Sequence, residues 1–206
     1  MRRNSADYAS RARLVAASRD LGDILRHSEP AHALAVYDYG LQRSAEIENT
    51  ESLQDRARLL ADSSYPLLAL HRREEAKRRI DAAFNLLGYL KLWPAQTIRP
   101  GDQATYALRA LGDYYADKSQ ATDAARTYRE LLDKTMASKP SPETDLRDAN
   151  SISVIERRLA ELERMAGQNE EADSLDRSRR ELWQRWDQRR PNNSFVRRQL
   201  TAVGLK

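Results

Sequence analysis

The chain of 206 residues has no cysteine, only seven glycines and seven prolines, and no long run of apolar residues. Without cysteine it cannot form disulfides, thiolate zinc sites, iron–sulfur clusters or a cysteine nucleophile. So little glycine and proline indicates few turns, and this argues against a β protein built from many hairpins. The longest apolar segments, Tyr65–Leu70 and Leu86–Trp93, are far shorter than the roughly 18 to 20 residues of a membrane-spanning helix.

A secretion signal is also missing, because no apolar segment follows the basic start of the chain. We therefore expect a cytoplasmic protein, with a fragment of a membrane-anchored protein as the alternative. The net charge is only +4, from 35 basic and 31 acidic residues. Of the basic residues 29 are arginine, a preference that needs an explanation.

Apolar residues recur almost everywhere at spacings of three and four, the periodicity of amphipathic helices. This pattern predicts eight helices in an all-α fold without strands. Asn49–Glu51 offers two alternative caps for one helix, and Ser141–Glu143 resembles the start of another, with proline at the first helical position. Pro66 falls in the middle of a predicted helix, where we expect a kink.

The predicted helices form four similar pairs. Leu111–Tyr115 followed by Ala124–Leu132 corresponds to Leu21–Leu25 followed by Ala33–Leu41. A small residue opens the second helix of every pair, and its successive copies are 43, 48 and 48 residues apart. The four copies are Ala33, Ala76, Ala124 and Ala172. Such equal spacings indicate a repeat architecture, in which helix pairs stack on copies of themselves.

The pattern of Leu-Gly, an aromatic residue three positions later, an alanine and a second aromatic residue resembles the tetratricopeptide repeat (TPR). It fits best at Leu111, Gly112, Tyr115, Ala124 and Tyr128. The resemblance implies one domain over residues 1–206, a right-handed α-solenoid of four TPR-like hairpins with a C-terminal capping helix. The implied repeats span about 8–48, 51–92, 102–137 and 143–190, and the cap 192–203. The pairs exceed the usual ~34 residues, and this extended variety resembles the tails of bacterial receptor-type serine/threonine kinases.

Catalytic signatures are missing from the sequence. The three histidines, His27, His32 and His71, lack the i, i+4 spacing of a helical metal site. There is no glycine-rich phosphate loop and no kinase catalytic motif. We therefore expect that this chain is not an enzyme and that it binds no cofactor or metal. A kinase domain, if the protein has one, would lie outside these residues.

The resemblance further implies that the first helix of each pair lines a concave groove that binds a partner. Transferred copy by copy, the groove residues are Arg19, Asp23, Arg26, Arg58, Tyr65, Tyr106, Arg109, Asp113, Arg157, Glu161 and Arg164. Arginine forks suit carboxylates or phosphorylated segments. In the alternative interpretation, Arg19 with Asp23, Arg109 with Asp113 and Arg157 with Glu161 pair along their own helices and face only solvent.

The C-terminal segment Arg177–Lys206 is strongly basic, with nine basic and two acidic residues. Trp183 and Trp186 alternate there with arginines, a pattern that can bind nucleic acid or an anionic surface. The residues of this alternative basic surface are Arg179, Arg180, Arg185, Arg189 and Arg190. We favour instead that both tryptophans pack on the preceding repeat.

The sequence thus predicts a scaffold that holds a partner protein or peptide, with an acidic partner favoured by the arginines. It would serve as the regulatory or sensory tail of a larger bacterial signalling protein. One alternative, less favoured, is a nucleic-acid or acidic-surface binder that acts through the basic C-terminal helix. Another is a homo-oligomerising assembly module, since the ends of a repeat stack expose apolar faces.

Overall fold

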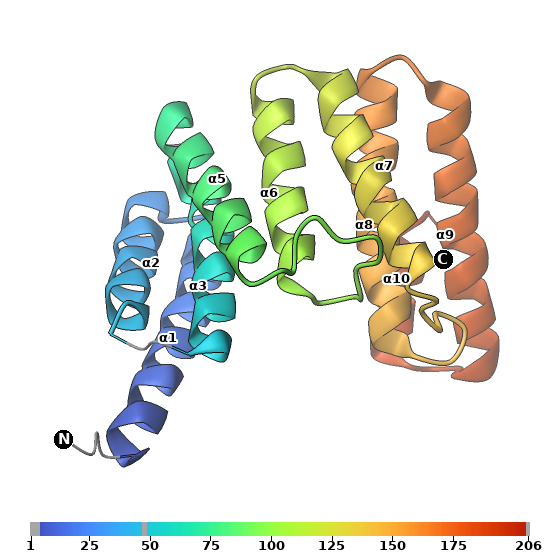
Figure 1. The fold of residues 1–206 in the computed structure, drawn as a ribbon. Coiled ribbons are helices and arrows are strands. Elements are labelled where there is room, and N and C mark those ends of the chain that lie inside the picture. The colour runs from blue at the N-terminus through green and yellow to red at the C-terminus, as the bar shows by residue number, and fades with distance from the viewer. Residues whose placement is uncertain (1–4, 47–48, 205–206) are drawn as a thin grey trace. The chain divides into compact units, whose positions relative to one another are not determined.

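The structure is a computed structural model that describes residues 5–46 and 49–204 (Figure 1). Every regular element in these two ranges is an α-helix, which confirms the all-α prediction. Ten helices are described: α1 (Ser5–Leu25), α2 (Pro30–Ser44), α3 (Thr50–Asp62), α4 (Ser64–Ala69), α5 (Arg73–Tyr89), α6 (Gln103–Asp117), α7 (Ala121–Ala137), α8 (Leu146–Met165), α9 (Asn169–Arg189) and α10 (Ser194–Ala202).

The helix count exceeds the eight predicted helices and their cap because one predicted helix is divided. α3 ends at Asp62 and α4 begins at Ser64, two residues before Pro66. Proline has no N–H to donate to the carbonyl of Asp62, so a continuous helix would lose a hydrogen bond at this point. The expected kink is a break of one residue at Ser63, whose own backbone stays in the right-handed helical region, with φ −68° and ψ −11°. α10 occupies the position of the predicted capping helix.

Polar side chains define where two helices begin. Asn49 caps α3 by accepting a hydrogen bond from the backbone N of Ser52 at 2.8 Å. Asp145 caps α8, where it accepts from the backbone N of Arg147 at 2.7 Å. The prediction that a helix starts at Ser141–Glu143 is therefore wrong. That segment is a turn, and the backbone N of Ser141 donates to Asp148 Oδ2 at 2.7 Å instead.

The chain divides into two compact units. Unit 1 contains residues 1–95 and 102–117, and unit 2 contains residues 96–101 and 118–206. The division falls between α6 and α7, inside the predicted third repeat. The prediction that all 206 residues form one domain stays a prediction, and each unit is described by itself.

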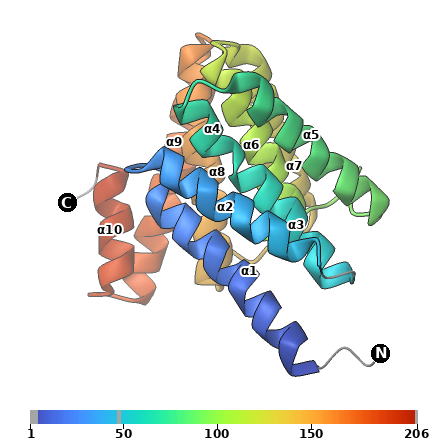
Figure 2. The same cartoon turned by 90° about the vertical axis from the view of Figure 1, so that its left-hand side faces the viewer.

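In unit 1, α1 and α2 form a hairpin, and α3 and α4 form a second hairpin with α5 (Figure 2). α3 also packs against α6, so the helices follow one another in series as in a solenoid. Gly22 allows α1 to approach α2 closely, because a Cβ atom at this position would lie 2.6 Å from Tyr37 Cζ. Tyr37 is completely buried in a core that also contains Leu59 of α3.

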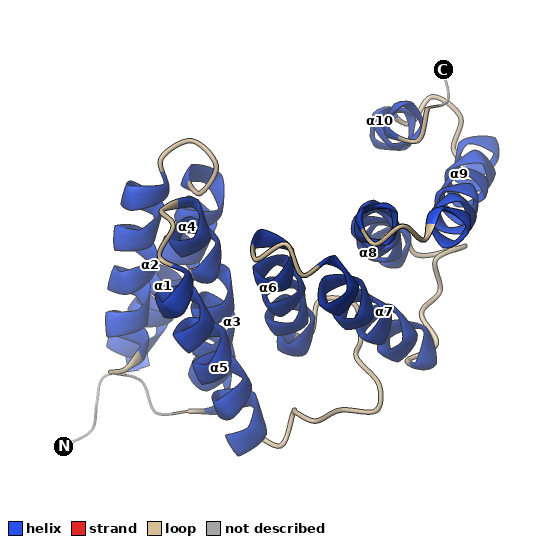
Figure 3. Ribbon diagram, turned by 90° about the horizontal axis from the view of Figure 1, so that it is seen from above, coloured by secondary structure: helices blue, strands red, loops and turns tan. Residues whose placement is uncertain are grey.

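In unit 2, α7 packs on α8, α8 on α9, and α10 on α9 (Figure 3). Trp183 and Trp186 of α9 belong to a core cluster with Val196 of α10, and Trp183 is completely buried. The tryptophans are thus buried as expected, but the prediction that they pack on the preceding repeat is wrong, because their neighbours Ala149 and Leu146 lie on α8 of the same predicted repeat and Val196 lies on α10. The marker alanines Ala33, Ala76, Ala124 and Ala172 are all completely buried.

Candidate partner-binding sites

Eight of the predicted groove residues lie in unit 1, on α1, α3, α4 and α6. We call them the unit 1 face: Arg19, Asp23, Arg26, Arg58, Tyr65, Tyr106, Arg109 and Asp113. All eight side chains are half-buried. They therefore lie at the margin between core and solvent, and their assignment to a groove stays a prediction.

The unit 1 face is joined across helices by arginine–tyrosine stacks. Arg26 Cζ of α1 lies 4.8 Å from the ring centroid of Tyr65 on α4. The Tyr65 hydroxyl donates to Asp113 Oδ2 of α6 at 3.2 Å. Arg58 Cζ of α3 lies 3.8 Å from the ring centroid of Tyr106 on α6. Guanidinium groups at these distances are attracted to the ring face, and their planes are held in place.

Carboxylate groups next to these arginine–tyrosine stacks complete the network. Arg58 Nε donates to Asp62 Oδ2 at 3.3 Å, and Asp62 is only 3% exposed. Burial raises the pKa of Asp62 to about 6, and the nearby charge of Asp23 adds to this effect while Arg58 opposes it. The Tyr37 hydroxyl donates to Asp23 Oδ1 at 2.7 Å, and Arg26 Nη1 lies 3.5 Å from the same oxygen.

One predicted pair within a helix is wrong in unit 1. Arg19 does not pair with Asp23, since its Nη2 lies 3.0 Å from Asp20 Oδ1 and its Nη1 lies 3.9 Å from Asp55 Oδ1 on α3. Asp23 turns instead toward Tyr37 of α2. The network thus links neighbouring helices, as well as turns of one helix.

The unit 1 face is nearly balanced in charge. Its four arginines are accompanied by Asp23 and Asp113 of the face, by the exposed Asp20, and by two aspartates of α3 that were not predicted for the groove, Asp55 and Asp62. Both could have been identified from the sequence as neighbours of Arg58. Asp55 lies three residues before it and Asp62 four residues after it, and residues at these spacings lie next to each other on a helix surface. A surface with this balance does not by itself attract a strongly acidic ligand.

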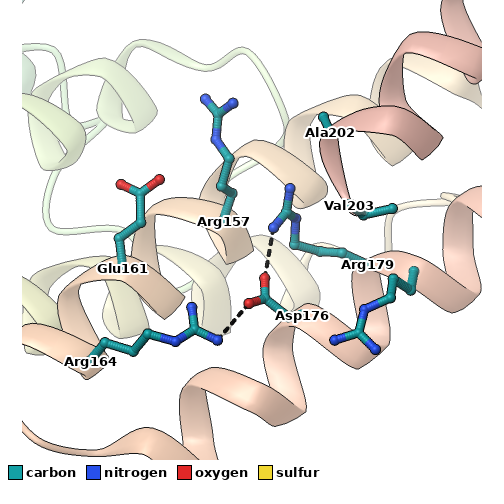
Figure 4. Close-up of a pocket in the computed structure, with 8 residues that line it drawn as sticks. Arg157, Glu161, Arg164, Asp176, Arg179, Ala202 and Val203 are labelled. Atoms are coloured by element: carbon teal, nitrogen blue, oxygen red, sulfur yellow. Dashed lines mark hydrogen bonds and ion pairs between the residues drawn. The ribbon is translucent and has the colours of Figure 1, made fainter. Parts of the chain in front are cut away.

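In unit 2, the other three predicted groove residues line a pocket of about 270 Å³. We call it the α8–α10 pocket, because α8, α9 and the end of α10 form its walls (Figure 4). Its lining consists of Arg157, Glu161, Arg164, Asp176, Arg179, Arg180, Ala202 and Val203. Five of these residues were not predicted for the groove.

Asp176 organises one wall of the pocket. Figure 4 shows its carboxylate between Arg164 and Arg179, with Arg164 Nη2 at 2.7 Å from Oδ2 and Arg179 Nη1 at 2.8 Å from Oδ1. Arg179 is only 5% exposed, and its Nε also donates to Ser153 Oγ at 3.4 Å. Its guanidinium plane is therefore fixed from two sides.

Two other arginines of the pocket are not neutralised. The predicted pair of Arg157 with Glu161 is wrong, because Glu161 accepts a hydrogen bond from Arg158 Nη1 at 2.9 Å. Within residues 5–46 and 49–204, neither Arg157 nor Arg180 has a hydrogen-bond or ion-pair partner. Both side chains are exposed.

A buried polar cluster lies behind the pocket. Ser153 Oγ accepts from Trp183 Nε1 at 2.9 Å as well as from Arg179. Glu156, also on α8, is 7% exposed and accepts from the Ser178 hydroxyl at 3.0 Å. Burial raises the pKa of Glu156 to about 7, while Ser178 and Arg179 oppose that effect.

The alternative basic surface forms only in part, since Arg180, Arg185, Arg189 and Arg190 are exposed but Arg179 is not. Arg179 is buried and paired with Asp176, so its assignment to a surface is wrong. Arg185 makes a two-pronged contact with Glu143, with both distances 3.0 Å, and Arg189 donates to the backbone carbonyl of Glu143. Of the five arginines, only Arg180 and Arg190 lack a partner within the described ranges.

The part of the chain that the structure describes contains no cluster of three or more His, Cys, Asp or Glu side chains placed to hold a metal ion. In the same residues, none of the helices combines the length and the apolar character that a membrane crossing requires.

Comparisons with known proteins assign no relatives to this chain. No protein-family model matches it, and no curated protein or solved structure matches it either. The interpretation of the two sites therefore depends on their own geometry.

Proposed function

We propose that this protein is a non-enzymatic TPR-like scaffold that binds a segment of a partner protein through the unit 1 face. The observation that carries the proposal is the set of arginine and tyrosine side chains held in fixed positions on successive helices. Arg58 on Tyr106 and Arg26 on Tyr65 are stacked and half-buried. Arginine and tyrosine dominate the binding energy of many protein interfaces.

Preorganisation supports the same conclusion. A flexible arginine loses side-chain entropy when it binds, and that loss weakens the complex. Arg58 is already held by a ring and by Asp62, and Arg26 by a ring and by Asp23. The balanced charge of the face favours a partner segment with polar, aromatic or mixed-charge side chains.

Site-specific photocrosslinking tests the proposal. A benzophenone amino acid would replace Tyr106 on the unit 1 face and, as a matched control, Tyr89, which is 76% exposed on α5. We expect a discrete adduct from position 106 in cells of the source organism, and no equivalent adduct from position 89. Absence of an adduct from position 106, or the same adducts from both positions, would contradict the proposed binding face.

Self-association is a second candidate, favoured by one exposed stripe on α1. Leu14, Leu21 and Ile24 are 37%, 45% and 73% exposed and lie within one side of the helix. Light scattering tests it. A mass above 23.6 kDa that returns to the monomer value in Leu21→Ser/Ile24→Ser would support self-association, whereas a monomeric parent protein would end the idea.

A further inference from the structure

The α8–α10 pocket combines concavity with uncompensated positive charge. Four guanidinium groups and two carboxylates line it, so the lining carries two net positive charges. Immediately outside the lining, Arg158 binds Glu161 and Asp173 binds Arg164, and these two charges cancel one another. Closely spaced cations repel one another unless an anion lies among them.

The arginines of the pocket differ in how they are held. Arg164 and Arg179 are fixed by Asp176, and Arg179 is further fixed by Ser153. Arg157 and Arg180 extend from the facing helices α8 and α9 without a partner within residues 5–46 and 49–204. The pocket therefore has one rigid cationic wall and two adjustable cationic side chains at its mouth.

We propose that this pocket binds a phosphate dianion, either free or as a phosphate monoester. A phosphate monoester carries a charge of about −1.5 to −2 at neutral pH and three acceptor oxygens, which matches the two net positive charges better than a carboxylate does. Planar guanidinium forks bind phosphate oxygens in pairs. Arg157 and Arg180 supply the open forks, and the paired guanidinium groups of Arg164 and Arg179 add their charge to the site.

The end of α10 favours the monoester over the free ion. Ala202 and Val203 form the apolar part of the lining (Figure 4). A free phosphate gains nothing from these two side chains, whereas the carbon chain of a phosphoserine or phosphothreonine has apolar surface to bury there. This site lies in unit 2 and is independent of the proposed partner-binding face in unit 1.

Calorimetric titration of the full chain tests the proposal. The probes are inorganic phosphate and a capped pentapeptide with a central phosphoserine, next to the same peptide with serine or glutamate. An ionic strength of about 0.1 M screens charges that lie more than about 10 Å apart, and a pH near 8 keeps the phosphate fully ionised, since its pKa is ~6. We expect both phosphate probes to bind, the serine peptide not to bind, and the glutamate peptide to bind at least about tenfold more weakly.

The variants locate the site. Arg157→Gln and Arg180→Gln should each weaken binding about tenfold or more, because each removes charge-assisted hydrogen bonds. Neither residue has a partner to lose, so both variants should fold. Arg177→Gln, on the same helix but outside the lining, removes the same charge and should change affinity less than about twofold by screened long-range attraction alone.

Three results would overturn the proposal. They are the failure of both phosphate probes to bind at millimolar concentration, equal affinity for the glutamate and phosphoserine peptides, and equal losses in Arg177→Gln and Arg180→Gln. Tighter binding of the phosphopeptide than of inorganic phosphate would identify a modified side chain as the source of the ligand. Binding of inorganic phosphate alone would identify the free ion.

Discussion

The predicted groove arginines behave differently in the two units. In unit 1, Arg19, Arg26 and Arg58 each find a carboxylate or an aromatic ring on another helix. In unit 2, Arg164 likewise binds Asp173 and Asp176 of α9, whereas Arg157, which occupies the position of Arg19 in its predicted repeat, finds neither a carboxylate nor a ring in the described ranges. Equivalent positions of the predicted repeats thus present arginine in two ways, held in place by neighbouring side chains at Arg19 and without a partner at Arg157.

The two outcomes have one physical cause. A guanidinium group that lies between stacked helices is desolvated, and it must be paired there to remain charged at acceptable cost. A guanidinium group at an exposed position stays solvated and tolerates the absence of a partner. Arg58 is in the first situation and Arg157 in the second.

The largest expected effect contrasts two adjacent arginines of α9. Arg179→Ala should lower the free energy of unfolding by about 3 kcal/mol, because it breaks a buried ion pair with Asp176 and a contact with Ser153. Arg180→Ala should change it by less than ~0.5 kcal/mol. Urea denaturation measures both. Similar losses in the two variants would show that Arg180 has a structural role and would break the comparison.

The next effect concerns the helix approach that supports the unit 1 face. Gly22→Ala should destabilise the protein by about 2 kcal/mol, because the added Cβ would overlap the Tyr37 ring that holds Asp23. Gly88→Ala is the control, since its Cβ would meet its nearest neighbour, Trp93 O, at 3.8 Å. That variant should gain up to ~1 kcal/mol of helix propensity. Denaturation curves in which both variants lose stability would refute the close-approach argument.

The fold was largely predictable because burial has a local pattern. Helix periodicity identified the helices, and three of the predicted pairs pack together: α1 with α2, α3 and α4 with α5, and α8 with α9. All four marker alanines are buried. Pro66 marked the interruption between α3 and α4, although its form as two separate helices was not predicted. The start of α8 was misplaced because Ser141–Glu143 and Asp145 offer competing start signals, and only tertiary structure decides between them.

The contacts of the candidate sites were less predictable, because they join residues that are distant in the sequence. Tyr65 bonds to Asp113, which is 48 residues away, and Tyr37 displaces Arg19 from Asp23. No helical spacing rule contains either contact. The pocket was not predictable either, because its wall includes Val203 at the end of α10, which is distant in the sequence from the lining residues of α8. The charge pattern within a helix therefore indicated which side of the helix carries polar residues, but not which residues those side chains contact.

A third prediction concerns one buried carboxyl group in each unit, Glu156 and Asp62. Burial raises the pKa of Glu156 to about 7 in the folded state, above the usual 4.5 of a glutamate. Between these values the folded state binds more protons than the unfolded chain, so this group's contribution to stability falls as pH rises through the window. Glu156→Gln removes that dependence and should be more stable than the parent near pH 8 by about 1 to 2 kcal/mol, with little gain near pH 5.

Thermal unfolding across this pH range measures the effect. Asp62 of unit 1 provides the comparison, because its pKa is raised from 3.8 to about 6 and its window lies lower. Asp62→Asn should therefore change the pH dependence mainly below pH 6. An identical stability difference between Glu156→Gln and the parent at all pH values would show that Glu156 is ionised normally in the folded protein.

The smallest expected effect tests whether the stacks of the unit 1 face hold the arginines in position. Arg58→Lys keeps the charge beside Asp62 but loses the planar stack on Tyr106, which should cost about 0.5 to 1 kcal/mol. Arg157→Lys should cost nothing measurable, since Arg157 has no stack or partner in the described ranges. A double-mutant cycle of Arg58→Lys with Tyr106→Leu isolates the contact, because the coupling energy excludes what each side chain contributes alone. A coupling near zero would mean that Arg58 is positioned by Asp62 only, and the unit 1 face would then be less preorganised than its geometry indicates.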